Sequence, residues 1–212
     1  GANVNHAMPG NIRALHLCAN LRQTKVLEAI VKKSDNVNVL TDEGFTALML
    51  AAYRYHFSCC DILLAHGANP ALKNQHGYSA LDYSANYPLL NGFLRTGQNP
   101  VSLIDKARIP EYISIAVDFY WSGKYGETVD LIEKILPGIE EQFGAADTAY
   151  YGMMLSYAAY SAYMKEDYIS AEKYYLKTID VFHKANVRSP MYNYSLFYLN
   201  KMYREQGIFE KA

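Results

Sequence analysis

Ser34-Asp-Asn-Val-Asn38 repeats Gly1-Ala-Asn-Val-Asn5 at a spacing of 33 residues, and Gly67-Ala-Asn-Pro-Ala71 repeats it again at the same spacing. A second series keeps this period: Arg13-Ala-Leu-His16, Thr46-Ala-Leu-Met49 and Ser79-Ala-Leu-Asp82. Each member of the second series opens a run of small and apolar residues, and an amphipathic segment follows it. A fixed period of this length predicts an all-α solenoid of stacked helical units, in which each unit contacts only its neighbours.

Residues that start and stop helices recur at the same positions of each unit. Gly44 and Gly77 are expected in tight turns that need a positive φ, and Gly67 is expected to end a helix. The hydroxyls of Thr46 and Ser79 are expected to cap the helices that follow them.

These residues resemble ankyrin repeats, of which residues 1–97 would hold about three. The resemblance implies paired helices that stack through alanine and leucine. It also implies that His16 ties adjacent loops together by hydrogen bonds. The third repeat departs from the pattern, because Pro88 and Gly92 are expected to interrupt a short second helix over residues 87–94.

Tyrosine becomes dense in the second half of the chain, where 15 of the 20 tyrosines follow residue 110. Three segments recur there at spacings of 43 and 41 residues: Ser122-Gly-Lys-Tyr-Gly-Glu-Thr128, Lys165-Glu-Asp-Tyr-Ile-Ser-Ala171 and Gln206-Gly-Ile-Phe-Glu-Lys-Ala212. Each is expected to join two amphipathic helices. The expected helices cover residues 111–121, 129–143, 148–164, 172–185 and 192–205.

This second pattern resembles tetratricopeptide repeats of the longer kind found in kinesin light chains. Ala159, Tyr168, Ala171 and Tyr175 carry the resemblance. Pro137 is expected to bend or end its helix. The division expected is ankyrin repeats over 1–97, a linker over 98–110, and tetratricopeptide-like repeats over 111–212 with the last one truncated. The linker is expected to pack, so that one continuous superhelix forms.

No pattern in the chain indicates catalysis, a cofactor or a metal. A formal net charge of −1 argues against a nucleic-acid partner. Phosphate-binding glycine loops are absent from the sequence, and no histidine pair has the spacing of zinc hydrolases. The three cysteines cannot form a disulfide framework, which favours a reducing, cytoplasmic setting. No apolar run is long enough to span a membrane. We therefore expect a protein that is not an enzyme.

The tetratricopeptide resemblance implies a groove lined by the first helix of each pair. A peptide with apolar anchors and some acidic character would fit it, because the groove is aromatic with a basic end. The alternative is that these tyrosines pack between helices, or that a further repeat of the chain fills the groove. The groove residues implied are Ile113, Val117, Tyr120, Met153, Ser156, Tyr160, Tyr163, Tyr194, Phe197, Lys201 and Arg204.

The ankyrin resemblance implies a second binding surface on the loop tips and the concave face. Several aromatic residues fall at positions that are normally exposed, which is more than solubility requires. Some of them are alternatively expected to pack against the tetratricopeptide-like part. The residues implied are Asp42, Glu43, Phe45, Tyr53, Arg54, Gln75, His76, Tyr78, Asn86 and Tyr87.

Together these features predict a non-catalytic scaffold or adaptor that binds a protein or peptide on its concave faces. One alternative is a regulatory or targeting module of a larger enzyme, such as an effector, whose catalytic domain lies outside this sequence. Another is a structural unit that associates with itself.

Overall fold

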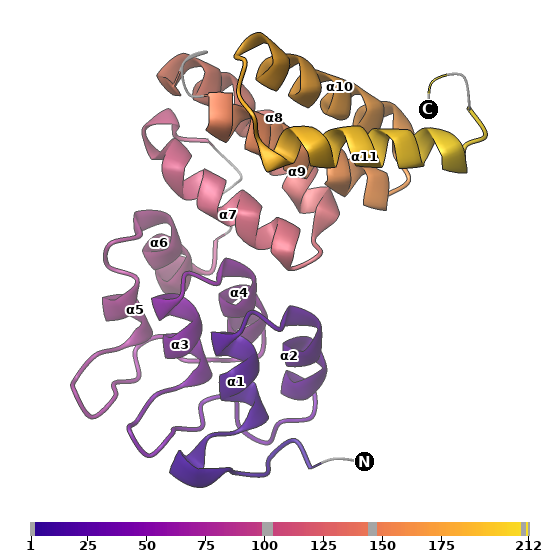
Figure 1. Ribbon diagram of the computed structural model, residues 1–212. Coiled ribbons are helices and arrows are strands. Elements are labelled where there is room, and N and C mark those ends of the chain that lie inside the picture. The colour runs from indigo at the N-terminus through magenta and orange to yellow at the C-terminus, as the bar shows by residue number, and fades with distance from the viewer. Residues whose placement is uncertain (1–2, 99–103, 144–147, 209–210, 212) are drawn as a thin grey trace. The chain divides into compact units, whose positions relative to one another are not determined.

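The computed structural model describes residues 3–98, 104–143, 148–208 and 211 (Figure 1). Within these ranges the chain is helical and contains no β-strand. The chain divides into two compact units, Gly1–Leu103 and Ile104–Ala212. The expected all-α fold of consecutive, stacked helices is confirmed.

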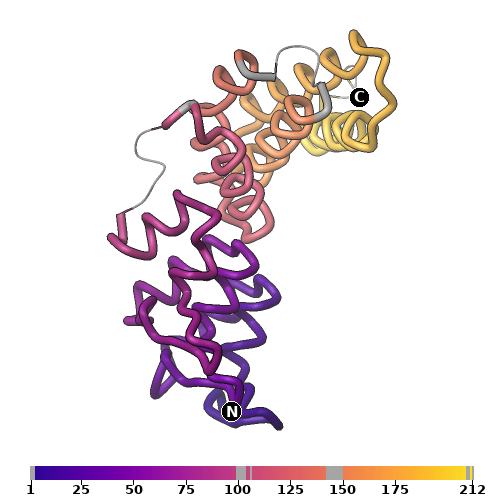
Figure 2. The backbone as a smooth tube through the Cα atoms, turned by 90° about the vertical axis from the view of Figure 1, so that its left-hand side faces the viewer, coloured from indigo at the N-terminus to yellow at the C-terminus, as the bar shows by residue number. Residues whose placement is uncertain are grey.

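The first unit is built from three successive helix pairs that follow a short 3₁₀ turn, η1 (Pro9–Asn11). Helices α1, α3 and α5 contact one another in a row, and α2, α4 and α6 form a second row behind them. The tube in Figure 2 shows these pairs stacked one upon the next. The pairs are α1 (Ala14–Asn20) with α2 (Thr24–Val31), α3 (Ala47–Tyr53) with α4 (Phe57–Ala65), and α5 (Ala80–Tyr83) with α6 (Pro88–Thr96).

Small residues fill the space between the pairs. Ala19, Ala47, Ala51 and Ala52 have no accessible surface, and Ala80 has 1%. Because a methyl group takes little room, helices at these positions approach closely and bury the leucines beside them. The leucines that complete this core are Leu15, Leu27, Leu48, Leu63 and Leu90.

The caps and turns expected from the sequence are present. Thr46 Oγ1 accepts a hydrogen bond from the backbone N–H of Met49 at 3.1 Å, and Ser79 Oγ accepts one from that of Asp82 at 3.3 Å. Gly44 has a φ of 82°, and a Cβ at this position would lie 2.9 Å from the backbone nitrogen of Gln75. Glycine is therefore needed at residue 44 both for the turn and for the approach of the next loop.

Two buried histidines hold successive repeats together. His16 Nε2 lies 3.1 Å from the carbonyl oxygen of Val39, in the next repeat, and His16 Nδ1 accepts a hydrogen bond from the backbone N–H of Arg13. This is the loop-tying role that the ankyrin resemblance implies. His56 makes a similar link, with Nδ1 3.0 Å from the carbonyl oxygen of Ala19 in the preceding repeat.

The expected interruption of the third repeat is wrong. Helix α6 runs unbroken over Pro88–Thr96, with Pro88 in its first turn and Gly92 within it. Proline is tolerated in the first helical turn, because the N–H that it lacks would have no partner inside the helix there. The departure lies instead in α5, which has only four residues.

The second unit contains five longer helices. Helix α7 (Ile109–Trp121) packs on α8 (Tyr125–Phe143), α9 (Thr148–Met164) packs on α10 (Tyr168–Lys184), and α11 (Pro190–Glu205) contacts both α10 and α9. Ser189 Oγ accepts a hydrogen bond from the backbone N–H of Met191 at 3.2 Å and so caps α11 as expected. Helix α8 continues through Pro137 to Phe143, so the expectation that this proline ends the helix is wrong.

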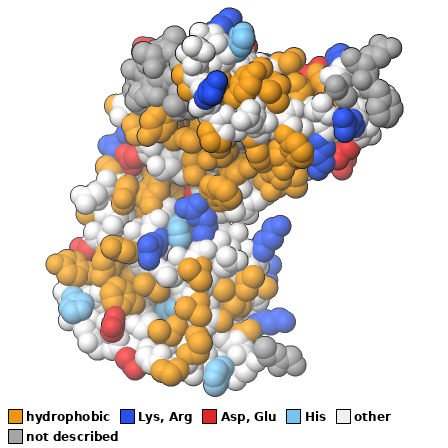
Figure 3. Space-filling model, in the orientation of Figure 1, with side chains coloured by type: hydrophobic (Ala, Val, Ile, Leu, Met, Phe, Trp, Pro, Cys, Tyr) orange, Lys and Arg blue, Asp and Glu red, His pale blue; other side chains and the backbone are white. Residues whose placement is uncertain are grey.

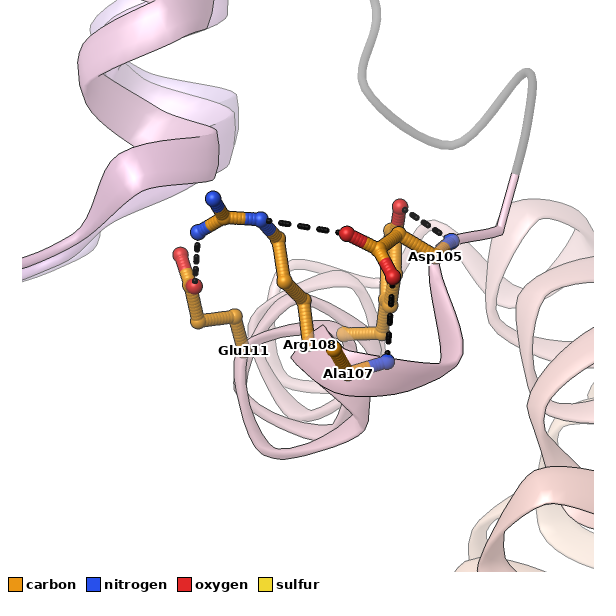
Figure 4. Close-up of polar contacts among 5 residues, drawn as sticks. Asp105, Ala107, Arg108 and Glu111 are labelled. Atoms are coloured by element: carbon orange, nitrogen blue, oxygen red, sulfur yellow. Dashed lines mark hydrogen bonds and ion pairs between the residues drawn. The ribbon is translucent and has the colours of Figure 1, made fainter.

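An arginine fixes the start of the second unit (Figure 4). Arg108 Nη1 lies 3.1 Å from Glu111 Oε1, and Arg108 Nε lies 3.4 Å from Asp105 Oδ2. Asp105 Oδ1 also accepts a hydrogen bond from the backbone N–H of Ala107 at 3.0 Å, within the turn η3 (Lys106–Arg108). Helix α7 therefore begins at Ile109, two residues before the expected start.

Two expectations fall outside the described residues. Val101 and Leu103 of the linker lie there, so the prediction of a packed linker and one continuous superhelix stays a prediction. Asp147, expected to start the helix at Thr148, also lies there.

We predict that stability of the first unit depends on the protonation of His16. Burial lowers the pKa of His16 below its ordinary value of 6.5, since the buried imidazole is held neutral. The resulting stabilisation is present above pH 6.5 and is lost as the pH falls, because the unfolded chain then binds a proton that the folded one excludes. The unfolding temperature should therefore fall below this pH in far-ultraviolet circular dichroism.

Tryptophan fluorescence distinguishes unfolding of the second unit from that of the first, because the single tryptophan, Trp121, belongs to the second unit. His16→Asn removes the buried imidazole, so the fall of the unfolding temperature in acid should be smaller in that variant than in the wild type. His76→Asn replaces an exposed histidine and is the matched control. An equal reduction in both variants would contradict the assignment to His16.

A second prediction concerns Tyr175, which has no accessible surface and whose hydroxyl has no hydrogen-bond partner among the described residues. A buried hydroxyl without a partner costs stability, so Tyr175→Phe should leave the free energy of unfolding unchanged or raise it by about 1 kcal/mol. Tyr203→Phe is the contrast, because the Tyr203 hydroxyl donates to Glu172 Oε1 at 2.6 Å. That variant should lose about 1 kcal/mol in urea unfolding. The reverse order of the two variants would refute the prediction.

Candidate functional site

The first unit carries a hollow of about 530 Å³ on the face formed by α1, α3 and the loop before α3. We call it the repeat hollow. Its floor is apolar, and its rim carries both acidic and basic side chains. The lining residues are Gly10, Ile12, His16, Leu17, Asn20, Thr41, Asp42, Glu43, Phe45, Leu50, Tyr53, Arg54 and Tyr83.

One column of the repeat supplies this floor. Leu17, Leu50 and Tyr83 are spaced by the repeat period of 33 residues, and all three line the hollow. Equivalent positions of stacked repeats point the same way, so a single column becomes a continuous strip. None of these three residues was expected at a binding surface, although their 33-residue spacing was a signal that could have found them.

Tyr83 organises the aromatic side chains at one end of the hollow. Its ring centroid lies 6.1 Å from that of Phe45, 5.7 Å from that of Tyr53 and 5.9 Å from that of Tyr78. Asn74 Nδ2 donates to the Tyr83 hydroxyl at 2.8 Å and fixes the ring. Tyr53 is 62% exposed and Tyr78 is 54% exposed, so a large aromatic surface remains open to solvent.

The structure places the expected residues of this face in three groups. Asp42, Glu43, Phe45, Tyr53 and Arg54 line the hollow. Gln75, His76 and Tyr78 lie on the next loop, where Gln75 Nε2 donates to the carbonyl oxygen of Asp42. Tyr87 lies apart from the hollow lining and packs on Tyr55, with ring centroids 4.4 Å apart, and Asn86 is exposed.

Arg54 is held at the rim by two contacts. Its Nε donates to Asn20 Oδ1 at 3.3 Å, and its guanidinium carbon lies 5.9 Å from the centre of the Tyr53 ring. An apolar floor with a polar and charged rim is the arrangement typical of protein interfaces.

The second unit carries a cluster of tyrosines on α7, α9 and α11, which we call the tyrosine cluster. Hydrophobic side chains gather over these helices on the face shown in Figure 3. Tyr160 of α9 lies at its centre, with ring centroids 5.8 Å from Tyr120 on α7, and 5.9 Å from Tyr194 and 5.0 Å from Tyr198 on α11. The hydroxyls of Tyr120 and Tyr194 share a hydrogen bond that joins α7 to α11.

A pocket of about 370 Å³ opens within this cluster, and we call it the aromatic pocket. Burial raises the pKa of Tyr160 to about 12 and also raises that of Tyr120 and Tyr194, which indicates a surrounding of low polarity. None of its lining side chains is charged at neutral pH. The lining residues are Tyr120, Trp121, Tyr125, Ser156, Tyr157, Tyr160, Met191 and Tyr194.

The expected groove residues divide between this pocket and its surroundings. The expected residues that line the pocket are Tyr120, Ser156, Tyr160 and Tyr194. Tyr163 and Phe197 contact the cluster through Tyr198, whereas Met153 and Val117 are half-buried away from the lining. Ile113 is buried and is not a groove residue, which corrects that expectation. The pocket residues that were not expected from the sequence are Trp121, Tyr125, Tyr157 and Met191.

The expected basic end of the groove needs a correction. Lys201 Nζ lies 5.6 Å from the ring centres of both Tyr163 and Tyr198, and 3.7 Å from Glu205 Oε1. Glu205 in turn accepts a hydrogen bond from the Tyr163 hydroxyl at 2.6 Å. Lys201 is therefore already engaged within the chain, and Arg204 is the exposed cation that remains at this end.

Within the described ranges, no group of three or more histidine, cysteine or acidic side chains is placed to hold a metal ion. The same residues contain no helix long and apolar enough to cross a membrane.

Comparison with known families bears on the first unit. Residues 15–100 match the family model for ankyrin repeats, in three copies. The matched segment includes the strip of Leu17, Leu50 and Tyr83 and every residue that lines the repeat hollow except Gly10 and Ile12. The helices that follow are consistent with a second set of repeats. Residues 15–100 of this chain are ankyrin repeats.

Proposed function

We propose that the protein is a non-catalytic scaffold that binds a polypeptide partner in the repeat hollow. Ankyrin repeats are in general protein-interaction modules, which supports the class of function. The observation that carries the proposal is the apolar strip of Leu17, Leu50 and Tyr83, open beside an exposed Tyr53 and bounded by charged residues. Leu17 is 40% exposed, so burying this strip under a partner would remove apolar surface from water.

The tyrosine cluster of the second unit supports a second contact for the same partner. Large tyrosine rings provide contact area at a small cost in conformational entropy, and they keep a hydroxyl for hydrogen bonding. Phe197 is 62% exposed at the edge of this cluster and offers a further apolar contact. Since Lys201 is paired within the chain, acidic residues of the partner are expected at Arg204 and Arg54 instead.

Affinity capture with the full chain tests the proposal. Tyr53→Glu changes an exposed residue of the hollow and should weaken partner binding at least about tenfold, because a charge is placed where an aromatic contact forms. Leu17→Glu should act in the same direction. The measurement is the dissociation constant for the captured partner by titration calorimetry, with helicity checked by circular dichroism.

Val26→Glu is the matched control, since Val26 is 49% exposed on α2 and does not line the hollow. This variant should bind like the wild type. If Tyr53→Glu and Val26→Glu bind the partner equally well, the repeat hollow is not the binding surface. Light scattering at several concentrations identifies the case in which the captured partner is a second copy of the chain.

A further inference from the structure

The aromatic pocket has the composition of a site for an organic cation. Its walls are tyrosine and tryptophan rings, its remaining residues are uncharged, and no carboxylate lines it. The face of an aromatic ring carries a negative electrostatic potential that attracts an ammonium group. Rings are therefore the only strong recognition element that this pocket offers.

Three of the rings bound the pocket from different directions. The ring centroid of Tyr120 lies 6.4 Å from that of Tyr125 and 5.8 Å from that of Tyr160. The centroids of Tyr125 and Tyr160 lie 6.1 Å apart. The ring planes are inclined by 69° for Tyr120 and Tyr125, by 64° for Tyr120 and Tyr160, and by 78° for Tyr125 and Tyr160. Rings set this steeply around one volume form a corner with walls on three sides, and a cation within it lies near more than one ring.

The chain uses neighbouring rings in this way for its own lysines. Lys201 Nζ lies between Tyr163 and Tyr198 at 5.6 Å from each ring centre, within the range of a cation–π contact. In the part of the chain that the structure describes, no lysine or arginine lies over Tyr120, Tyr125 or Tyr160. The pocket rings are thus available to an ammonium group from outside the chain.

We propose that the aromatic pocket binds the ammonium group of a lysine side chain carried by the partner polypeptide, with methylated lysine bound most tightly. A quaternary ammonium has no N–H donor, so it loses less on leaving water than a primary ammonium that needs hydrogen-bond acceptors. The tyrosines that line the pocket are half-buried and Trp121 is 63% exposed, and cation–π contacts strengthen to the extent that water is excluded. This assignment rests on the proposed function only for the source of the ammonium group.

Recognition by ring faces also sets the salt dependence. Lys165 Nζ would lie 3.5 Å from a Cβ on Gly126, the residue after Tyr125, and none of the residues that line the pocket is charged. A ligand cation held here is not held by ion pairing. Its affinity should therefore not fall as ionic strength rises, in contrast to binding through carboxylates.

A pair of small molecules of nearly equal shape tests the pocket directly. Choline carries a quaternary ammonium, and 3,3-dimethyl-1-butanol carries a neutral carbon in its place. Trp121 is the only tryptophan and lines the pocket, so its fluorescence reports occupancy in the full chain. Choline should bind about tenfold more tightly than the neutral isostere. Equal affinity, or no saturable response to choline, would overturn the proposal.

Variants separate the ring faces from the hydroxyl groups. Tyr125→Leu and Tyr160→Leu remove a wall and should weaken choline binding about tenfold each, whereas Tyr125→Phe and Tyr160→Phe keep the ring and should bind within about twofold of the wild type. The phenylalanine variants preserve the packing, so they keep the test decisive if a leucine variant fails to fold. Loss of binding in the phenylalanine variants would overturn recognition by the ring face.

Peptides decide the source of the cation. One peptide is made with lysine, trimethyl-lysine or norleucine at a single position, and its binding to the wild type and to Tyr160→Leu is compared. Tightest binding of the trimethyl-lysine form, lost in Tyr160→Leu, is the result expected. Choline binding without any peptide preference would overturn the polypeptide source. Failure in this experiment leaves the repeat hollow untouched, because that surface is tested separately by Tyr53→Glu.

Discussion

The fold depends on one constraint, which is that a single helix pair is too small to bury its own apolar face. Each pair of the first unit buries that face against the next pair, and alanines such as Ala47, Ala51 and Ala52 let the helices come close enough to do so. The same constraint creates the functional surface. A column of residues that faces away from the stacking contact is repeated at every pair, so Leu17, Leu50 and Tyr83 form a strip that no further helix of the described unit covers.

The second unit also buries alanines, such as Ala116, Ala158 and Ala159, and adds buried tyrosines such as Tyr112 and Tyr175. A tyrosine fills the space between helices but brings a hydroxyl that needs a partner when it is buried. The Tyr203 hydroxyl donates a hydrogen bond to Glu172, and the Tyr163 hydroxyl donates one to Glu205. The hydroxyls of Tyr120 and Tyr194 share another. Of these tyrosines, Tyr120 and Tyr194 line the aromatic pocket, so the hydrogen bond between them joins two of its walls.

Much of the first unit could be predicted from the sequence, because a 33-residue period, capping hydroxyls and turn glycines act locally. The failures arose where the outcome depends on neighbours in space. Pro88 and Gly92 were expected to interrupt a helix, and Pro137 to bend or end one, yet Pro88 lies in the first turn of α6 and α8 continues past Pro137. Lys201 was expected at the basic end of the groove, and it also contacts Tyr163 of another helix, α9, which the linear pattern could not show. Its ion pair with Glu205 has the i,i+4 spacing of neighbours on one helix and could have been read from the sequence.

The two surfaces differ in the kind of force that they offer. Asp42, Glu43 and Arg54 put charges of both signs on the rim of the repeat hollow, so binding there gains from charge pairing and weakens with salt. The aromatic pocket has no charged lining and attracts a cation through ring faces, which salt screens little over such short contacts. A partner that used both would therefore lose only part of its affinity at high ionic strength. The fraction retained would measure how much of its binding falls on the tyrosine cluster.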